Sequence, residues 1–139
     1  MTEVNAILAM GSSGQMGLNG RLPWLSDDYA EQVKADLAWF AKLTAGGVLV
    51  VGRRTYDEMI AMGFKNKDRA LAVWSRDQNV GPGGFITMLY QKYPGRPIWI
   101  CGGAETFECF KGYIMRWHIS RIAYNGPADV RFNPVWLLG

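Results

Sequence analysis

The chain has 139 residues, of which 49% are hydrophobic and 19% are charged, and its formal net charge is +3 at pH 7. This composition is typical of a soluble globular protein with a single core, and it excludes a disordered chain. The apolar runs are short, well below the roughly 20 residues that cross a bilayer, and the N-terminus lacks the pattern of a secretory signal. We therefore expect a cytoplasmic protein without membrane contact, built as one domain over residues 1–139. The mild positive charge favours a small anionic ligand over nucleic acid.

The cysteines and the histidine indicate neither a disulfide framework nor a metal. Cys101 and Cys109 are too few for such a framework, so we expect two reduced thiols. His118 is the sole histidine of the chain, and no paired-cysteine motif accompanies it. We therefore predict no metal site.

The N-terminal third predicts a strand, a loop and a helix, in that order. Val4–Met10 is an apolar run that is typical of a buried strand. Residues 11–20 contain four glycines together with serine and asparagine, which indicates a flexible loop. Ser26, followed by two aspartates, can start a helix that continues to about Thr44, where two glycines end it.

The rest of the chain alternates between apolar runs and helical segments. The pattern predicts strands over residues 48–51, 70–74, 97–101 and 115–124, helices over residues 54–62, 87–93 and about 104–111, and a turn at residues 81–84. Residues 125–139 show no clear pattern. The alternation predicts an α/β fold with a mainly parallel sheet and helices on both faces, in which ligands bind at the carboxyl ends of the strands.

The glycines after the first strand raise the question of a dinucleotide-binding turn. Gly11, Gly14 and Gly17 have the spacing G-x-x-G-x-x-G, whereas the Rossmann fingerprint needs G-x-G-x-x-G with a helix directly behind it. A mobile loop that closes over a ligand fits the composition better, and an ordinary surface loop fits it equally well.

One carboxylate lies in an apolar stretch of the first predicted helix. Asp36 and Phe40 are four residues apart and share a helical face, with Leu37, Ala38 and Trp39 around them. Desolvation there would raise the pKa of Asp36, and its carboxylate could bind a protonatable heterocycle through two parallel hydrogen bonds. The alternative is a solvated aspartate on the outer face of an amphipathic helix.

Arginines cluster where two predicted strands end. Arg53, Arg54 and Thr55 stand at a strand-to-helix junction, and Arg76 follows the next strand. Helix N-termini attract phosphates and arginines add charge, so this group suggests a dinucleotide with an extra phosphate, such as NADPH. Exposed arginines without a ligand are the alternative.

A further ligand turn is predicted around residues 100–107. Gly102 and Gly103 lie between a buried strand and a helix, where they permit close backbone approach to a ligand, and the helix start can hold a pyrophosphate. A tight strand–helix turn without a ligand is the alternative. The chain shows no Ser-His-Asp triad, phosphate loop or carboxylate metal cage, which favours a reaction whose chemistry a cofactor supplies.

These motifs, in this order, resemble the dihydrofolate reductase family, and the resemblance covers nearly the whole chain. The matching segments are residues 6–10, 17–24, 36–40, 52–56, 69–76 and 100–107, and the likeness continues through Ser120 into residues 129–134. The resemblance implies a three-layer α/β/α sandwich with a mainly parallel central sheet. It also implies NADPH-dependent reduction of dihydrofolate to tetrahydrofolate, by transfer of a hydride from the nicotinamide to the pterin.

The resemblance implies roles for individual residues at the pterin. Asp36 is similar to the single acid that binds the pterin and promotes protonation of its N5, Trp24 to the tryptophan that helps order water beside it, and Ser120 to the hydroxyl that hydrogen-bonds the acid. Phe40 is expected to stack against the substrate and Arg69 to pair with the α-carboxylate of its glutamate tail. The substrate-binding residues implied are Ala6, Phe40, Arg69 and Cys101.

The same resemblance implies an NADPH site and a lid. Arg53, Arg54 and Thr55 are expected at the cofactor phosphates, and Arg76 near the 2′-phosphate, which favours NADPH over NADH. The backbone of Ala6 and Ile7 would meet the nicotinamide carboxamide, and residues 11–22 would form the lid. The cofactor-binding residues implied are Ile7, Gly17, Leu18, Arg53, Arg54, Thr55, Ser75, Arg76, Gly102, Gly103, Ala104, Glu105 and Thr106.

Two departures from the family pattern leave alternatives open. About seven additional residues separate Trp24 from Asp36, so Asp28 is a rival for the acid, although only Asp36 has Phe40 one turn further on. The chain also stops before the usual C-terminal pair of antiparallel strands, which would leave residues 115–124 as an exposed edge. We expect either that residues 135–139 cover this edge or that two chains pair there.

We therefore predict a dihydrofolate reductase that acts as a monomer, with an edge-strand dimer as the alternative. Two other functions stay open. One is another NADPH reductase of the same fold, such as the enzyme of riboflavin synthesis that reduces a ribosylaminopyrimidine. The other is a short, non-catalytic relative with a structural or binding role, which only the missing strands support.

Overall fold

The molecule is built on a five-stranded sheet in which all neighbouring strands are parallel. The computed structural model describes residues 3–61, 63–64, 68–77 and 79–139. Across the sheet the strands lie in the order β4-β3-β5-β1-β6. Their bounds are Ala70–Trp74 (β4), Val48–Gly52 (β3), Ile98–Gly102 (β5), Val4–Met10 (β1) and Arg116–Arg121 (β6). This arrangement confirms the predicted α/β class and the mainly parallel sheet.

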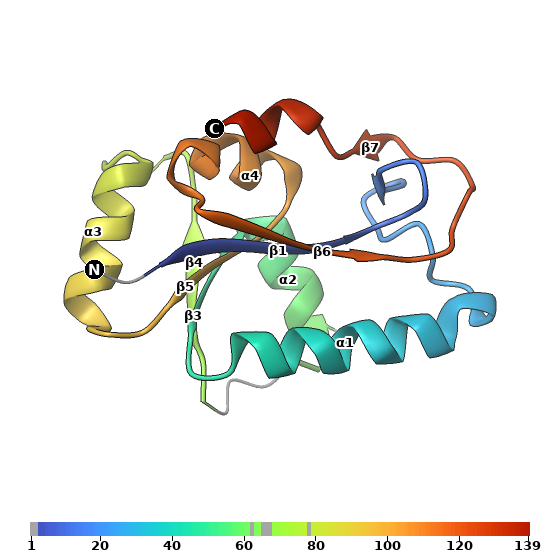
Figure 1. Cartoon of the computed structure of the whole chain (residues 1–139), viewed down its shortest axis with the longest axis horizontal. Helices are drawn as coiled ribbons and strands as arrows, with labels where there is room; N and C mark the ends of the chain where they lie inside the picture. The colour runs from blue at the N-terminus through green and yellow to red at the C-terminus, as the bar shows by residue number, and fades with distance from the viewer. Residues whose placement is uncertain (1–2, 62, 65–67, 78) are drawn as a thin grey trace.

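Helices cover both faces of the sheet and produce three layers. α1 (Ala30–Thr44) and α2 (Arg53–Ala61) lie on one side, and α3 (Pro82–Lys92) and α4 (Ala104–Phe110) lie on the other (Figure 1). Side chains alternate along each strand, so β1 contributes to both layers. Ala6 and Leu8 pack into the core under α3 and α4, whereas Ile7 packs with Leu49 and Trp99 under α1.

Several strands and helices lie where the sequence predicts them. β1 and β4 have the predicted bounds, and β3 and β5 agree with their predictions to within one residue at each end. The predicted helix from Ser26 is a 3-10 turn over Asp27–Tyr29 followed by α1. The helix predicted over residues 54–62 is α2, which begins one residue earlier, while Met62 lies outside the described residues.

Two predicted elements were wrong in extent. Residues 81–84 were predicted as a turn, but α3 begins at Pro82, because proline fits the first position of a helix, where no intrahelical N–H bond is required. Residues 115–124 were predicted as one strand, but β6 ends at Arg121. Beyond it the chain leaves the sheet, because Ile122 and Tyr124 pack against Trp24 in a separate cluster.

The glycine-rich loop after β1 is more ordered than predicted. Its residues Gln15–Gly17 form β2, which pairs antiparallel with β7 (Val130–Arg131) near the C-terminus. Gln15 is 1% exposed, accepts a hydrogen bond from the backbone N–H of Ser13 (2.7 Å) and donates one to the carbonyl of Gly126 (3.1 Å). The first half of the predicted lid is thus attached to the body of the protein.

The C-terminal residues cover a face of the sheet and not its edge. They form the 3-10 helix η3 (Pro134–Leu138), whose Trp136 is 4% exposed. The Trp136 ring lies parallel to that of Trp117 on β6, with centroids 6.2 Å apart, and also packs on Phe107 and Phe132. β6 has a strand partner on one side only within the described part of the chain.

Two further expectations concern the thiols and the helices. Cys101 and Cys109 are both free thiols, as predicted. None of the helices within the described ranges is long and apolar enough to cross a membrane.

Candidate active site

The predicted acid lies on α1 with one oxygen buried and unpaired. Asp36 Oδ1 is shielded from solvent and has no hydrogen-bond partner among the described residues. Burial raises the pKa of Asp36 above its ordinary value, and a hydrogen bond from the Ser120 hydroxyl lowers this pKa in part. Ser120 is on β6, in register with Ala9 on β1, so strand pairing fixes where its hydroxyl meets the helix. Oδ1 of Asp36 can therefore accept a hydrogen bond from a ligand.

The rival acid has different surroundings. Asp28 lies on the short 3-10 turn before α1, and its side chain is exposed. The additional residues between Trp24 and Asp36 form this turn and the first turns of α1, where Tyr29 and Val33 pack against the cluster of Trp24 and Tyr124. Of these two aspartates, Asp36 is the one that is half-buried and whose pKa is raised by desolvation.

Trp24 is a core residue beside this acid. It is 2% exposed and lies edge-on to Tyr124, with ring centroids 6.0 Å apart. Two members of its cluster connect it to the acid: Val33 is three residues before Asp36 on α1, and Ala9 pairs with Ser120. Trp24 is thus linked to Asp36 through these two neighbours, and a role in ordering water stays a prediction.

Phe40 lies one turn further along α1, and Arg69, which directly precedes β4, packs near its ring. The guanidinium of Arg69 is 5.8 Å from the centre of the Phe40 ring and 4.9 Å from that of Phe64. Its Nη1 donates a 3.2 Å hydrogen bond to the hydroxyl of Thr44, whereas its Nε is buried without a hydrogen-bond partner and lies 3.6 Å from a carboxylate oxygen of Asp68. An arginine held in this way can bind an anionic group of a ligand through its free donors.

Strands β1 and β5 separate where the nicotinamide was predicted to lie. Their ladder ends at the pair Ala6–Ile100, and beyond it β1 pairs only with β6 within the described residues. The side chains of Ala6 and Ile7 are buried, 0% and 2% exposed, so only their backbone can meet a ligand there. The end of the ladder lies toward the carboxyl ends of parallel strands, the usual location of ligands in such sheets.

Cys101, at the end of β5, is a poor nucleophile. Its thiol donates a 3.4 Å hydrogen bond to the carbonyl of Trp99. Burial raises the pKa of the Cys101 thiol, and the nearby charge of Arg69 offsets only part of that rise. The residue therefore serves as an apolar wall beside Arg69 and not as a thiolate.

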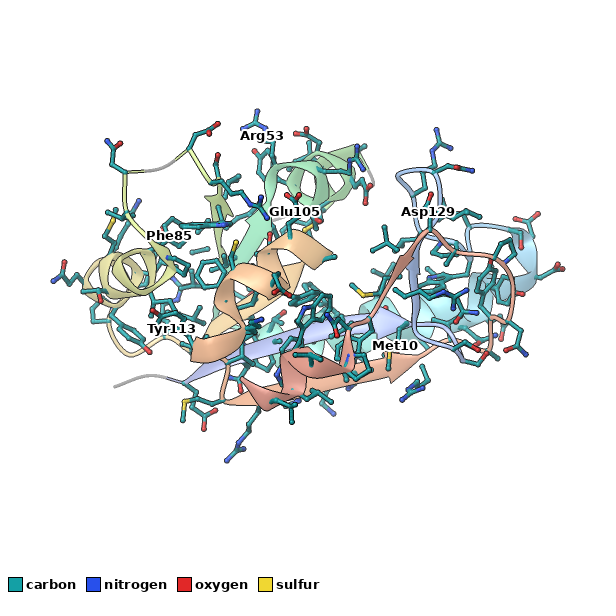
Figure 2. All side chains as sticks on the ribbon, turned by 90° about the horizontal axis from the view of Figure 1, so that it is seen from above. Met10, Arg53, Phe85, Glu105, Tyr113 and Asp129 are labelled. Carbon is teal, nitrogen blue, oxygen red and sulfur yellow. The ribbon has the colours of Figure 1, made fainter. Side chains whose placement is uncertain are left out.

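A cleft of about 260 Å³ lies at the ends of β3 and β4, between α2 and α4. Six of the predicted cofactor-binding residues line it, namely Arg53, Arg54, Ser75, Arg76, Glu105 and Thr106. Figure 2 shows Arg53 on α2 and Glu105 on α4 on the same side of the molecule. The arginines that the sequence places in separate motifs thus meet around one cavity.

Two of these arginines already have carboxylate neighbours. Arg53 Nε lies 3.6 Å from Asp57 on the same helix, and Arg76 Nη2 lies 4.0 Å from Glu105 on the opposite wall of the cleft. Burial raises the pKa of Glu58, and the charges of Arg54 and Arg21 lower it in part. The cleft is therefore cationic, but its charge is partly balanced.

Gly17 and Leu18 lead to a hairpin tip that approaches the cleft. Leu18 and Arg21 exchange two backbone hydrogen bonds, and Asn19 and Gly20 between them have φ of 53° and 79°, as a two-residue hairpin turn requires. A Cβ on Gly20 would lie 3.7 Å from Nη1 of Arg54. Asp129 accepts a 2.9 Å hydrogen bond from the backbone N–H of Asn19 and holds the turn from the other side (Figure 2). This tip, residues 18–21, is the part of the predicted lid that directly follows β2.

The paired glycines and their neighbours lie between the two subsites. A Cβ on Gly103 would be 3.6 Å from the hydroxyl of Thr55, so this turn faces the start of α2. Ala104 begins α4 and is partly buried against the core. Gly102 and Gly103, at the end of β5, thus face Thr55 in the first turn of α2, next to the cleft arginines.

Some cleft residues were not predicted from the sequence. They are Gly52, Trp74, Asp77 and Cys109. Three of them are direct neighbours of predicted residues, and Cys109 follows Glu105 by four positions, so helical periodicity would have placed both on one face. Within the described residues, no three histidine, cysteine or acidic side chains are placed to hold a metal ion.

Comparison with known proteins supports the likeness that the geometry suggests. The family model described as dihydrofolate reductase matches residues 3–137. Dihydromethanopterin reductase of Methylorubrum extorquens is 35% identical over 100% of this chain and 96% of its own length. Dihydrofolate reductase of Mycobacterium tuberculosis is 27% identical over 93% of the chain and 77% of its own length, and dihydrofolate reductase type 8 of Escherichia coli is 30% identical over 78% and 67%. With a family model that matches nearly every residue, the chain belongs to the dihydrofolate reductase family.

Proposed function

We propose that this protein uses NADPH to reduce the pterin ring of a 7,8-dihydropterin. The observation that carries the proposal is the Asp36 carboxylate, which is desolvated on α1 and has one unpaired oxygen. A carboxylate in this state can accept two parallel hydrogen bonds from the amino group and ring N–H of a pterin. Its negative charge also favours protonation of the ring.

The residues around the cleft fit a phosphorylated dinucleotide. Arg53, Arg54 and Arg76 supply positive charge, and the wall of Trp74 and Cys109 supplies an apolar surface for a base. A Cβ on Gly52 would lie 2.8 Å from the Thr106 hydroxyl, so the floor of the cleft is formed by close approach of β3 and α4. When bound, NADPH would supply the hydride, and the protein would supply binding, orientation and the proton.

Each residue group has a separate task in this proposal. Asp36 and Ser120 would hold the pterin, and the nicotinamide would lie beside it, where β1 and β5 stop pairing. Arg69, fixed by Thr44 between Phe40 and Phe64, orients the part of the substrate beyond the ring. The hairpin tip at residues 18–21 would close over the ligands and exclude water.

Two dihydropterins are candidate substrates, each for its own reason. The chain matches the dihydromethanopterin reductase over 96% of that protein's length, whereas it covers 77% of the length of the dihydrofolate reductase of Mycobacterium tuberculosis. This makes dihydromethanopterin the first candidate. Dihydrofolate is the second, because Arg69 is suited to the carboxylate of a glutamate tail.

The test is oxidation of NADPH, followed at 340 nm, with each substrate in turn. Dihydromethanopterin, dihydrofolate and the tail-free 6-methyl-7,8-dihydropterin are compared at equal concentration, with and without methotrexate. Turnover of the tail-free compound would establish pterin reduction, and the ratio of kcat/KM between the two complete substrates would identify the natural class. No turnover of any of the three, in a protein that binds NADPH, would overturn the proposal.

A further inference from the structure

The ion pair between Arg76 and Glu105 spans the cofactor cleft. Arg76 follows the end of β4, Glu105 is in the first turn of α4, and Nη2 of the arginine lies 4.0 Å from Oε1 of the glutamate. Both side chains line the same cleft of about 260 Å³. A carboxylate therefore stands where the proposed function requires an extra phosphate to bind.

This pair can open without cost to the fold. The side chains of Arg76 and Glu105 are 64% and 82% exposed, and an exposed pair at this distance contributes little to stability. Arg53 on the adjacent wall has its own carboxylate neighbour, Asp57, at 3.6 Å. An anion that binds Arg76 would therefore compete with Glu105 for the same guanidinium.

We infer that Glu105 sets the discrimination between NADPH and NADH. A 2′-phosphate adds about two negative charges near Arg76, and Glu105 repels those charges while it competes for the same guanidinium. A free ribose hydroxyl carries no charge and can donate a hydrogen bond to the Glu105 carboxylate. Glu105 therefore weakens the binding of NADPH and supports the binding of NADH. It reduces the preference for NADPH over NADH that Arg76 creates.

The inference rests on the proposed function only in taking a nicotinamide dinucleotide as the ligand of the cleft. It is tested by binding alone, without any pterin. Dissociation constants for NADPH and for NADH are measured by titration calorimetry and by quenching of tryptophan fluorescence, since Trp74 lines the cleft. The variants are Glu105→Gln and Arg76→Gln. Glu31→Gln, at an exposed position of α1, is the control for the loss of one negative charge.

In Glu105→Gln, the dissociation constants of NADPH and NADH are expected to change in opposite directions. Glu105→Gln is expected to tighten NADPH binding about 3- to 10-fold at low ionic strength and to weaken NADH binding about 2-fold. The gain for NADPH is expected to shrink in about 0.5 M salt, because screening removes the repulsion. Arg76→Gln is expected to weaken NADPH about 10-fold with little effect on NADH, and Glu31→Gln is expected to leave both constants unchanged.

Three outcomes would overturn the inference. The first is a ratio of the two dissociation constants in Glu105→Gln that stays within 2-fold of the unaltered protein. The second is an equal change for both dinucleotides, which would show a general charge effect. The third is no binding of either dinucleotide, which would also remove the cofactor from the proposed function, whereas binding without pterin turnover would overturn only the proposed reaction.

Discussion

The hydroxyl of Ser120 on β6 hydrogen-bonds the carboxylate of Asp36 on α1, so the edge strand of the sheet and a helix packed on it meet at a half-buried acid. Pairing with β1, where Ala9 is the partner of Ser120, fixes the register of this strand. The position of the acid thus depends on strand pairing as well as on the helix.

Replacement of Asp36 by asparagine is expected to lower turnover of the pterin without changing the binding of NADPH. Asp36→Asn keeps the shape of the side chain but loses the charge that favours ring protonation, so kcat for a 7,8-dihydropterin is expected to fall about 100-fold at pH 7. The dissociation constant of NADPH should stay within about 2-fold, since the arginine cleft is unaltered. A variant that keeps more than half of the activity would contradict the assigned role of Asp36.

The same substitution is expected to stabilise the ligand-free protein at neutral pH. The pKa of Asp36 is raised in the folded state by burial, so the folded protein holds its proton more tightly than the unfolded chain does. The stability that this gives is complete below the unfolded pKa near 4 and is lost as the pH rises through the folded pKa. Because the carboxyl group is only partly buried, Asp36→Asn should raise Tm by about 1–3 °C at pH 7 and by nothing at pH 3.5. Thermal melts at the two pH values measure this, and an equal shift at both would reject the explanation.

Asp68 is expected to weaken the binding of anionic substrates. Its carboxylate lies 3.6 Å from Nε of Arg69 and is 59% exposed, so it balances part of the charge that a substrate carboxylate would use. Asp68→Asn should therefore lower the KM for dihydrofolate about 2- to 5-fold. The tail-free 6-methyl-7,8-dihydropterin serves as the control substrate, and its KM should not move. A parallel change for both substrates would indicate a general effect on the site.

Trp136 is expected to anchor the C-terminal residues. It is 4% exposed, packs on Phe107, Trp117 and Phe132, and its ring N–H donates a hydrogen bond to Glu108. Trp136→Ala should cost about 3–5 kcal/mol in urea unfolding, as for other large aromatic side chains removed from a core. Leu138→Ala, at an 85% exposed position of the same 3-10 helix, should change stability by less than about 0.5 kcal/mol. Similar losses for both variants would show that the tail is only loosely attached.

The sequence was sufficient where structure depends on local pattern. β1 and β4 are apolar runs with clear boundaries, so their bounds could be predicted to the residue. The start of α3 was missed because Pro82 and two glycines resemble a turn. Gly83 lies against a distant residue, since a Cβ at this position would be 2.8 Å from the hydroxyl of Tyr113, and the local pattern does not reveal this contact.

Pairings between distant segments could not be predicted. β2 and β7 have three and two residues, too few for a period to be visible, and they join parts of the chain more than 110 residues apart. The site shows the same division. Asp36 and the arginines stand out as residue types in context, whereas the pairing of Arg76 with Glu105 depends on how α4 lies against the end of β4.

The outer edge of β6 determines how this sheet can meet other chains. The strand begins and ends with the exposed residues Arg116 and Arg121. If two copies paired antiparallel over all six residues, each Arg116 would stand opposite an Arg121, and like charges in that position oppose pairing. The two arginines thus oppose the addition of further copies at the edge of the sheet. They stand at the ends of β6, so the middle of the strand is occupied by Trp117 and Ser120.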